Sequence, residues 1–374
     1  MSNSIFRKRQ DSLMDTIPEY DLDALVLNPG PDLAYLTGLS FHLMERPVVA
    51  FFLPDQDPIF VLPELETQKL QDLSYPVESF PYQEDRSHWL TAFQSAVVKG
   101  ELDSSRLGVI PRRMRFLELN FLKQAAPQAS FHDGQSVTRS LRIIKDQIEI
   151  QAMQRACHIA QRAMQTLRES LNPGITEKQA AAKLVSLMLE EGSEPDFPFF
   201  PIVSFGEHSA NPHATPQDSA LHNNQLVLID WGATVEGYHS DITRAFHYGD
   251  VNEELAHIAR IVQEANQVGR RAVRPGIPCS KVDQRVRSVI EDAGYGDAFI
   301  HRTGHGLGKE AHEEPFIAAD DETRLRPGMS FTIEPGIYLP GTGGVRIEDV
   351  VVVTDNGCKS LSNLPRGLES FWLE

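Results

Sequence analysis

The chain has 374 residues, enough for two domains, and its 35 basic and 52 acidic residues give a formal net charge of −17. This acidic balance argues against nucleic acid or an anionic membrane surface as a partner. The three cysteines lack CxxC spacing, so they indicate neither a disulfide framework nor a zinc–thiolate site. No apolar run reaches the length of a membrane span and the first residues lack a signal-peptide pattern, which predicts a cytoplasmic protein.

The first 135 residues alternate short apolar runs with amphipathic helical patterns. Strands are expected at 24–27, 48–53, 59–62, 107–110 and 129–132, and helices at about 4–15, 64–73, 87–98 and 114–124. This alternation predicts an α/β domain with a mainly parallel or mixed sheet.

One loop of this domain carries polar residues just before a strand, namely His42, Glu45 and Arg46 in SFHLMERPVV. Residues of this kind are usually solvated loop residues. The alternative is that the loop reaches an active site, since binding residues are often carried on loops.

The rest of the chain contains two similar helix–turn–helix patterns. They are helices at 141–171 and 176–192 around the turn PGIT, and helices ending at 274 and 294 around the turn PGIP. An acidic residue follows each turn at a similar distance, because Asp230 lies 57 residues after Pro173 and Glu334 lies 59 after Pro275. We interpret this repetition as an internal duplication. It predicts that residues 136–374 form an α+β domain, with a curved antiparallel sheet backed by helices and two halves related by a pseudo-twofold axis.

The stretch 225–246, QLVLIDWGATVEGYHSDITRAF, reads as a hairpin with its turn near residues 235–237. If the turn is centred between Val235 and Glu236, Asp230 faces Asp241. Residues facing each other in a hairpin have Cβ atoms about 5 Å apart, where like charges repel. Two carboxylates in such positions need a cation between them or a proton on one of them. The alternative of two solvated turn acids is weakened by the apolar run 226–229 that leads into Asp230.

A second hairpin of the same kind follows in FTIEPGIYLPGTGGVRIEDVVVV. Its loop, residues 339–344, is centred on Gly341, so Glu334 faces Glu348. Four carboxylates arranged as two pairs balance the charge of two divalent cations. The sequence therefore predicts a metal site between the two hairpins.

The segment between the hairpins, HRTGHGLGKEAHEEP at 301–315, carries three histidines. Its glycines and its proline argue against one continuous helix. His305 is flanked by Gly304 and Gly306, which allow the backbone to approach another group closely. A lone histidine is more often a core or surface residue than a ligand, but the predicted carboxylates favour His305 as a ligand. His213, in the proline-rich stretch SANPHATP, would by itself be taken for part of a linker.

A metal site with one imidazole and several carboxylates suits Mn²⁺ or Co²⁺ and accepts Zn²⁺ as an alternative. The predicted ligands are Asp230, Asp241, His305, Glu334 and Glu348. Two metals about 3.5–4 Å apart polarise a carbonyl and lower the pKa of a bound water. Such a site hydrolyses amides, esters or phosphates.

Four segments together resemble the pita-bread metallopeptidases, a family that includes prolidase, aminopeptidase P, methionine aminopeptidase and creatinase. They are IIKDQIEIQAM, DWGATVEGYHSDITRAF, HRTGHGLGKEAHEEP and TIEPGIYLPGTGGVRIED, and the resemblance covers about 141–374. Residues 1–135 resemble the small N-terminal domain of the prolidase, aminopeptidase P and creatinase branch. Methionine aminopeptidase lacks that domain and creatinase lacks the metal ligands, so the prolidase and aminopeptidase P branch is favoured.

The resemblance also implies roles for individual residues. His213 and His312 match two histidines that are not ligands and that hydrogen-bond the substrate and the tetrahedral intermediate. Glu334 would be a ligand and would also accept the proton of the attacking water. His301 matches a position in the pocket for the proline ring, and Arg346 a basic residue close to the ligands. Members of this branch commonly form dimers, so a homodimer is expected.

One departure from the family concerns substrate length. Many prolidases carry an arginine after the His-Glu-x-Pro stretch, where it meets the carboxylate of a dipeptide, and this chain has Phe316 there. Arg46 is then the candidate partner of the carboxylate. The sequence predicts an Xaa-Pro dipeptidase, with an Xaa-Pro aminopeptidase acting on longer peptides as the alternative. A lyase, an amidinohydrolase or a binding protein on the same fold is the alternative of another class.

Overall fold

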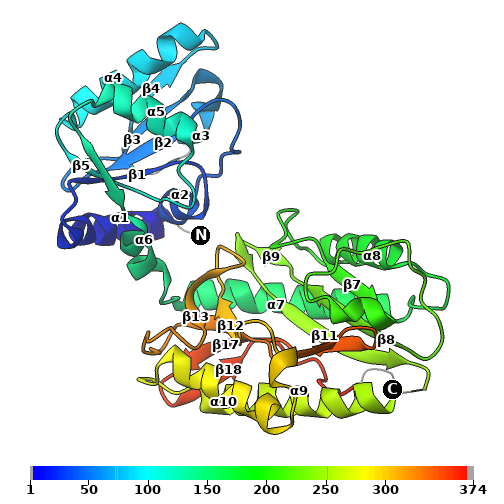
Figure 1. The fold of residues 1–374 in the computed structure, drawn as a ribbon. Coiled ribbons are helices and arrows are strands. Elements are labelled where there is room, and N and C mark those ends of the chain that lie inside the picture. Colours follow the sequence, from blue (N-terminus) through cyan, green and yellow to red (C-terminus); the bar gives the residue numbers. More distant parts are fainter. Residues whose placement is uncertain (1–2, 72, 74, 251, 369–374) are drawn as a thin grey trace. The chain divides into compact units, whose positions relative to one another are not determined.

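Two units make up the chain in the computed structural model, which describes residues 3–71, 73, 75–250 and 252–368 (Figure 1). One unit comprises the residues up to Arg142 and the other begins at Ile143, whereas the boundary predicted from the sequence follows residue 135. The predicted fold class, an α/β domain followed by an α+β domain, is confirmed. Across the described part of the chain, every helix is too short or too polar to cross a membrane.

The N-terminal unit is built on a mixed six-stranded sheet with the order β4-β3-β2-β1-β5-β6. Its strands are β1 (Ala24–Leu27), β2 (Val49–Phe52), β3 (Ile59–Pro63), β4 (Glu78–Tyr82), β5 (Arg106–Val109) and β6 (Ser130–Asp133). Five of them were predicted, and β4 was missed. Strand β4 lies at the edge of the sheet, is largely exposed and contains a proline, so it lacks the apolar run that marks a buried strand.

Helices cover both faces of this sheet, so its central strands β1, β2 and β3 are buried along their whole length. Along β1, Ala24 and Val26 belong to one apolar core, and Leu25 and Leu27 belong to the other. The helices are α1 (Asn3–Thr16), α2 (Pro31–Thr37), α3 (Gln68–Gln71), α4 (Trp89–Lys99), α5 (Phe116–Ala125) and α6 (Gln135–Arg142). The short helices α2 and α6 were not predicted.

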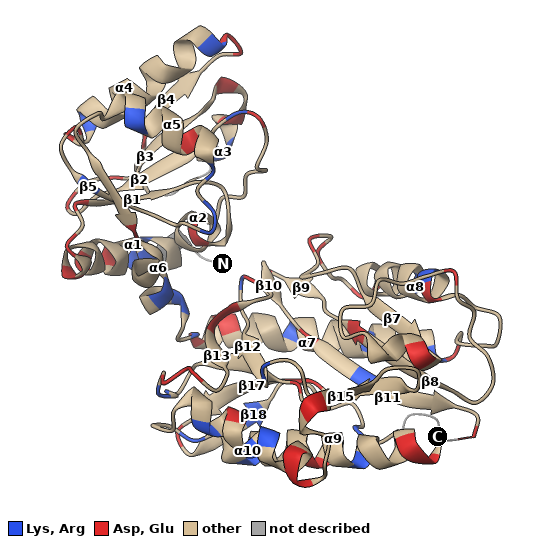
Figure 2. Ribbon diagram, viewed as in Figure 1, with Lys and Arg blue, Asp and Glu red and all other residues tan. Residues whose placement is uncertain are grey.

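The C-terminal unit contains the two predicted helix pairs (Figure 1). They are α7 (Gln147–Arg168) with α8 (Glu177–Glu190), and α9 (Glu253–Ala272) with α10 (Cys279–Asp292). The prediction that the first helix starts at Leu141 was wrong. Helix α7 starts at Gln147 because the Asp146 side chain accepts hydrogen bonds from the first-turn backbone, while the side chain of Glu149 caps Asp146 in return. Figure 2 shows acidic and basic residues interspersed on α9 and α10.

The strands of this unit pair antiparallel, as predicted, and form several small sheets. The largest have the orders β11-β8-β7 and β13-β12-β14-β17-β18. The strands are β7 (Ile202–Phe205), β8 (Gln225–Trp231), β9 (Thr234–Val235), β10 (Tyr238–His239), β11 (Ile242–Tyr248), β12 (Gly304–Gly306), β13 (Glu313–Ile317), β14 (Ser330–Ile333), β15 (Gly336–Leu339), β16 (Gly343–Arg346), β17 (Asp349–Thr354) and β18 (Gly357–Ser360).

The register of the first hairpin differs from the prediction. Asp230 pairs with Thr243 and not with Asp241, because β11 is shifted by two residues along β8 relative to the predicted register. The turn consists of Glu236 and Gly237, which both have positive φ (53° and 69°), between the paired residues Val235 and Tyr238. Two positive φ values in a two-residue loop define the tight turn that suits the twist of a hairpin. The sequence argument placed the centre of this turn one residue too early.

The register of the second hairpin is confirmed. Ile333 pairs with Asp349, and Gly336 pairs with Arg346. Both pairs have the predicted register. Glu334 and Glu348 lie between them, where the pairing of β14 with β17 ends and that of β15 with β16 begins.

Candidate metal centre

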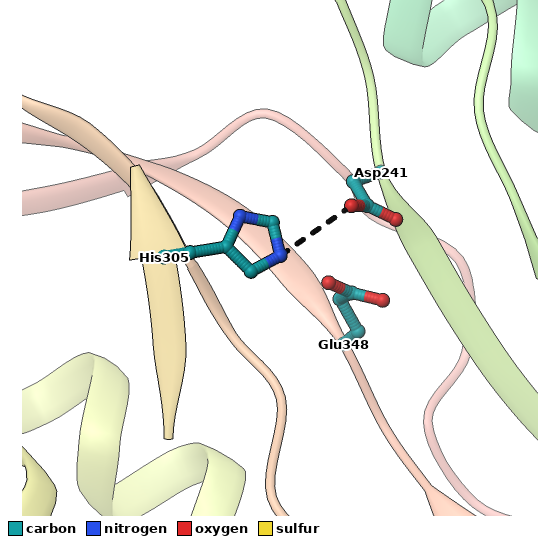
Figure 3. A group of neighbouring side chains, drawn as sticks. All are labelled: Asp241, His305 and Glu348. Carbon is teal, nitrogen blue, oxygen red and sulfur yellow. Dashed lines mark ion pairs between the residues drawn. The ribbon is translucent and has the colours of Figure 1, made fainter. Parts of the chain in front are cut away.

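A histidine and two carboxylates converge in the C-terminal unit (Figure 3). Asp241 lies between β10 and β11, His305 on β12, and Glu348 between β16 and β17. Each of them offers a ligand atom within 4.8 Å of the other two, and all three are buried. The His305 Nε2 atom lies 3.7 Å from Asp241 Oδ2. The side chains in Figure 3 point toward one another from three separate segments of the chain, an arrangement that suits a metal ion.

The other two predicted ligands border this group. Glu334 lies between β14 and β15, and its Oε1 atom is 3.2 Å from His305 Nε2. Asp230, near the end of β8, accepts a hydrogen bond of 2.7 Å on Oδ2 from Arg346, and its charge raises the pKa of Asp241. The structure therefore brings together all five residues that the sequence singled out as ligands.

The carboxylates of this cluster are costly to ionise without a cation. Burial, followed by the neighbouring carboxylates, raises the pKa of Asp241 and of Glu348 well above their ordinary values. Burial also raises the pKa of Asp230. Within the described residues, the buried Oδ1 atoms of Asp230 and Asp241 have no hydrogen-bond partner. Buried acceptors without a donor are rare in folded proteins. Divalent cations fit this donor set, because they would neutralise the charges and bind the free oxygens.

Glu334 behaves differently from the other acids. Burial raises its pKa, but the hydrogen bond and charge of His305 lower it more, and the pKa is about 2. The Thr332 hydroxyl also donates to Glu334 Oε1, over 2.9 Å. Glu334 is therefore held as a carboxylate, able to accept a proton.

Arg346 is buried among the predicted ligands. Its Nη2 atom donates to Asp230, its Nε atom donates to Thr243 Oγ1 at 3.0 Å, and its Nη1 atom lies 3.0 Å from the Tyr338 hydroxyl. Thr243 in turn donates to Glu348 Oε2 at 2.7 Å. These contacts orient one carboxylate from each hairpin.

The sequence analysis did not single out Thr243 or Tyr338. The pairing of residues across the two hairpins could have indicated both side chains. Tyr338 lies two residues from Gly336, the partner of Arg346, so the two long side chains share a face at diagonal positions. Thr243 directly faces Asp230 once the turn is placed correctly.

The three other histidines predicted to belong to the site, His213, His301 and His312, lie beside this cluster. The ring of His312 is 4.0 Å from that of His305, between centroids. Burial, followed by the charges of His305 and Arg302, lowers the pKa of His312 to about 4, so its imidazole is neutral at pH 7. His301 contacts the Tyr338 hydroxyl through Nε2 at 2.9 Å and packs edge-on against Phe299. Burial lowers the pKa of His301. The charge of His213, on the loop after β7, lowers the pKa of both His301 and His312 further.

Two residues that the sequence linked to the substrate carboxylate have defined neighbours. The guanidinium of Arg46, in the N-terminal unit, donates to both carboxylate oxygens of Glu84, at 2.9 and 3.2 Å. Phe316, on β13, packs under the guanidinium of Arg302, whose Cζ atom is 4.5 Å from the ring centroid.

Comparison with known proteins agrees with this site. Residues 151–355 match the model of metallopeptidase family M24, and residues 9–144 match the creatinase/prolidase N-terminal domain. An Xaa-Pro dipeptidase of Pyrococcus horikoshii is 34% identical over 97% of this chain and 99% of its own length.

Two solved structures show the same fold. Dipeptidase PepE from Mycobacterium ulcerans has a TM-score of 0.90 and 35% identity, and the match covers 98% of both chains. An X-Pro aminopeptidase from Thermotoga maritima has a TM-score of 0.85 and 28% identity, covering 96% of this chain and 98% of its own. The chain belongs to metallopeptidase family M24, with the N-terminal domain of the creatinase and prolidase branch.

Proposed function

We propose that the chain is an Xaa-Pro dipeptidase that binds two divalent cations through Asp230, Asp241, His305, Glu334 and Glu348. The observation that carries this proposal is the buried carboxylate cluster, with its raised pKa values and its two carboxylate oxygens that lack hydrogen-bond partners among the described residues. The oxygen-rich ligand set favours Mn²⁺ or Co²⁺ over Zn²⁺. The name of the P. horikoshii relative supports a dipeptide ending in proline as substrate.

The chemistry divides between the cations and the side chains around them. When bound, the cations polarise the scissile carbonyl and lower the pKa of the attacking water. Glu334 is the proposed acceptor of that water's proton, because it is an ionised carboxylate that lies among the candidate ligands, 3.2 Å from His305.

The neutral imidazole of His312 donates a hydrogen bond to the oxygen that gains negative charge, and His213 orients the substrate from the facing loop. A donor aimed at a developing oxyanion acts mainly in the transition state. His301 and Phe299 form one wall of the pocket for the proline ring.

Arg46 is the proposed partner of the substrate carboxylate. In the structure its guanidinium is paired with the carboxylates of Glu84 and Glu45. The competing function is an Xaa-Pro aminopeptidase, which needs no such partner. Phe316 is itself uncharged where many prolidases have an arginine, and the positive charge next to its ring is that of Arg302. A lyase, an amidinohydrolase or a binding protein is disfavoured because the full ligand set is present. We further propose that the protein is a homodimer in the cytoplasm.

The metal ligands are tested by Asp241→Asn and Glu334→Gln. Both variants are expected to lose turnover and to bind less metal by elemental analysis. Chelation should lower the melting temperature of the wild type, because a ligand that binds only the folded state stabilises it. Glu264→Gln, which changes an exposed acid on α9, is the matched control and should leave all three properties unchanged. Normal metal content and activity in the first two variants would remove the basis of the proposed centre.

The two histidines are tested by His213→Ala and His312→Ala. Each variant should keep its metal and lose about 10²–10³-fold in kcat with a smaller change in KM, because each group is proposed to act mainly in the transition state. Steady-state kinetics together with elemental analysis make the comparison. Loss of metal in either variant would show that this histidine is a ligand.

Substrate length is tested with Ala-Pro, Ala-Pro-Ala and the uncharged amide Ala-Pro-NH₂. The wild type should prefer Ala-Pro, and Arg46→Ala should raise KM for Ala-Pro about tenfold, because a charge-assisted contact is lost. KM for the other two peptides should change little, and Arg86→Ala, another exposed arginine of the N-terminal unit, should leave all three unchanged. A wild type that prefers Ala-Pro-Ala, with an Arg46→Ala variant that treats the three alike, would identify an aminopeptidase.

A further inference from the structure

A buried ion pair lies immediately beside His312. The Nζ atom of Lys145 is 2.6 Å from Glu313 Oε1, and only 1% and 9% of the two side chains are exposed. Lys145 precedes helix α7, and Glu313 is the first residue of β13. The other carboxylate oxygen of Glu313 accepts a backbone hydrogen bond from Glu310, over 3.4 Å. The Glu313 side chain thus holds the loop that leads to His312.

Strand geometry links this pair to the direction of His312. Successive side chains of an extended chain point to opposite sides. Along β13 the odd-numbered residues are buried and the even-numbered ones are half-buried. His312 lies at a bend immediately before this strand, so anchoring the buried side chain of Glu313 fixes the backbone next to His312, whose ring meets that of His305.

Lys145 itself is fixed to the strand that follows a metal ligand. Its backbone N–H donates to the carbonyl of Gly328 at 2.9 Å, and the N–H of Gly328 donates to Val353, on β17, at 3.0 Å. Strand β17 begins one residue after Glu348. The ion pair therefore connects the segment carrying His312 to the strand that follows Glu348.

The fit around the pair is close. A Cβ atom on Gly308 would lie 2.6 Å from Glu313 Oε1 and 3.0 Å from Lys145 Cε. Ion pairs this deeply buried add little net stability compared with apolar residues, and fixing a conformation is one recognised use for them.

We propose that Lys145 and Glu313 are positioning residues that hold His312 in its catalytic orientation. This inference rests on the proposed function, because His312 is the group that would contact the substrate. The ion pair does not touch the substrate and acts only through the backbone of β13.

The test places Lys145→Met in the wild type and in the His312→Ala variant, with Ala-Pro and Ala-Pro-Ala as substrates. In the wild-type background, kcat should fall about tenfold or more with little change in KM and unchanged metal content, because small displacements of a catalytic group are costly. In the His312→Ala background the same substitution should have no further effect on kcat. Gly308→Ala, which displaces the pair but keeps both charges, should follow the same pattern.

Asp32→Asn is the matched control, because it breaks the similarly buried 2.6 Å pair of Asp32 and Arg142 in the N-terminal unit. This substitution should lower the melting temperature without changing kcat. An equal loss of kcat from Lys145→Met in both backgrounds, or no loss in the wild type, would overturn the positioning role alone. A wild type that hydrolyses neither peptide would overturn the proposed function, and the positioning role with it.

Discussion

The repulsion among four neighbouring carboxylates, three of them buried, is the constraint on which the rest of this site depends. Burial raises the pKa of Asp230, Asp241 and Glu348, and the charges of neighbouring carboxylates raise that of Asp241 and Glu348 further. Glu334, in contrast, is kept ionised by His305. A fold that packs such groups together without counterions loses stability, since burying an uncompensated charge costs several kcal/mol, of the order of 3–5. Cations relieve the repulsion, and the same cations supply the Lewis acidity that hydrolysis of an amide requires.

The fold meets this constraint with two hairpins and the short strand that carries His305, and each of them supplies proposed ligands. The hairpins are joined directly at the site, where the N–H of Glu348 donates to the carbonyl of Thr243 at 3.1 Å. Arg346 and Thr243 then orient carboxylates of both hairpins. Because these hydrogen bonds hold the carboxylates in place, the site is arranged before metal or substrate arrives, which favours tight and selective binding.

The sequence predicted the ligand set because acids that interrupt apolar strands are visible in the pattern of residues. It predicted the register at Glu334 and Glu348 because the loop between them has a clear centre at Gly341. It placed Asp241 opposite Asp230 wrongly, because the conformation of Glu236 and Gly237 decides that register and Glu236 is an unusual residue for positive φ. The contact of Thr243 with Glu348 and the Lys145–Glu313 pair escaped prediction, because they join residues 105 and 168 positions apart. The Tyr338–Arg346 contact was overlooked, although it follows from the register of the second hairpin that was predicted correctly.

Locating the cations tests the central claim most directly. Crystals grown with Mn²⁺ and measured at the manganese absorption edge should show two anomalous peaks, both among Asp230, Asp241, His305, Glu334 and Glu348. The separation of the peaks should be about 3.5–4 Å, as in other two-metal hydrolytic sites. Anomalous density that is absent from this cluster, or that lies elsewhere in the protein, would contradict the account.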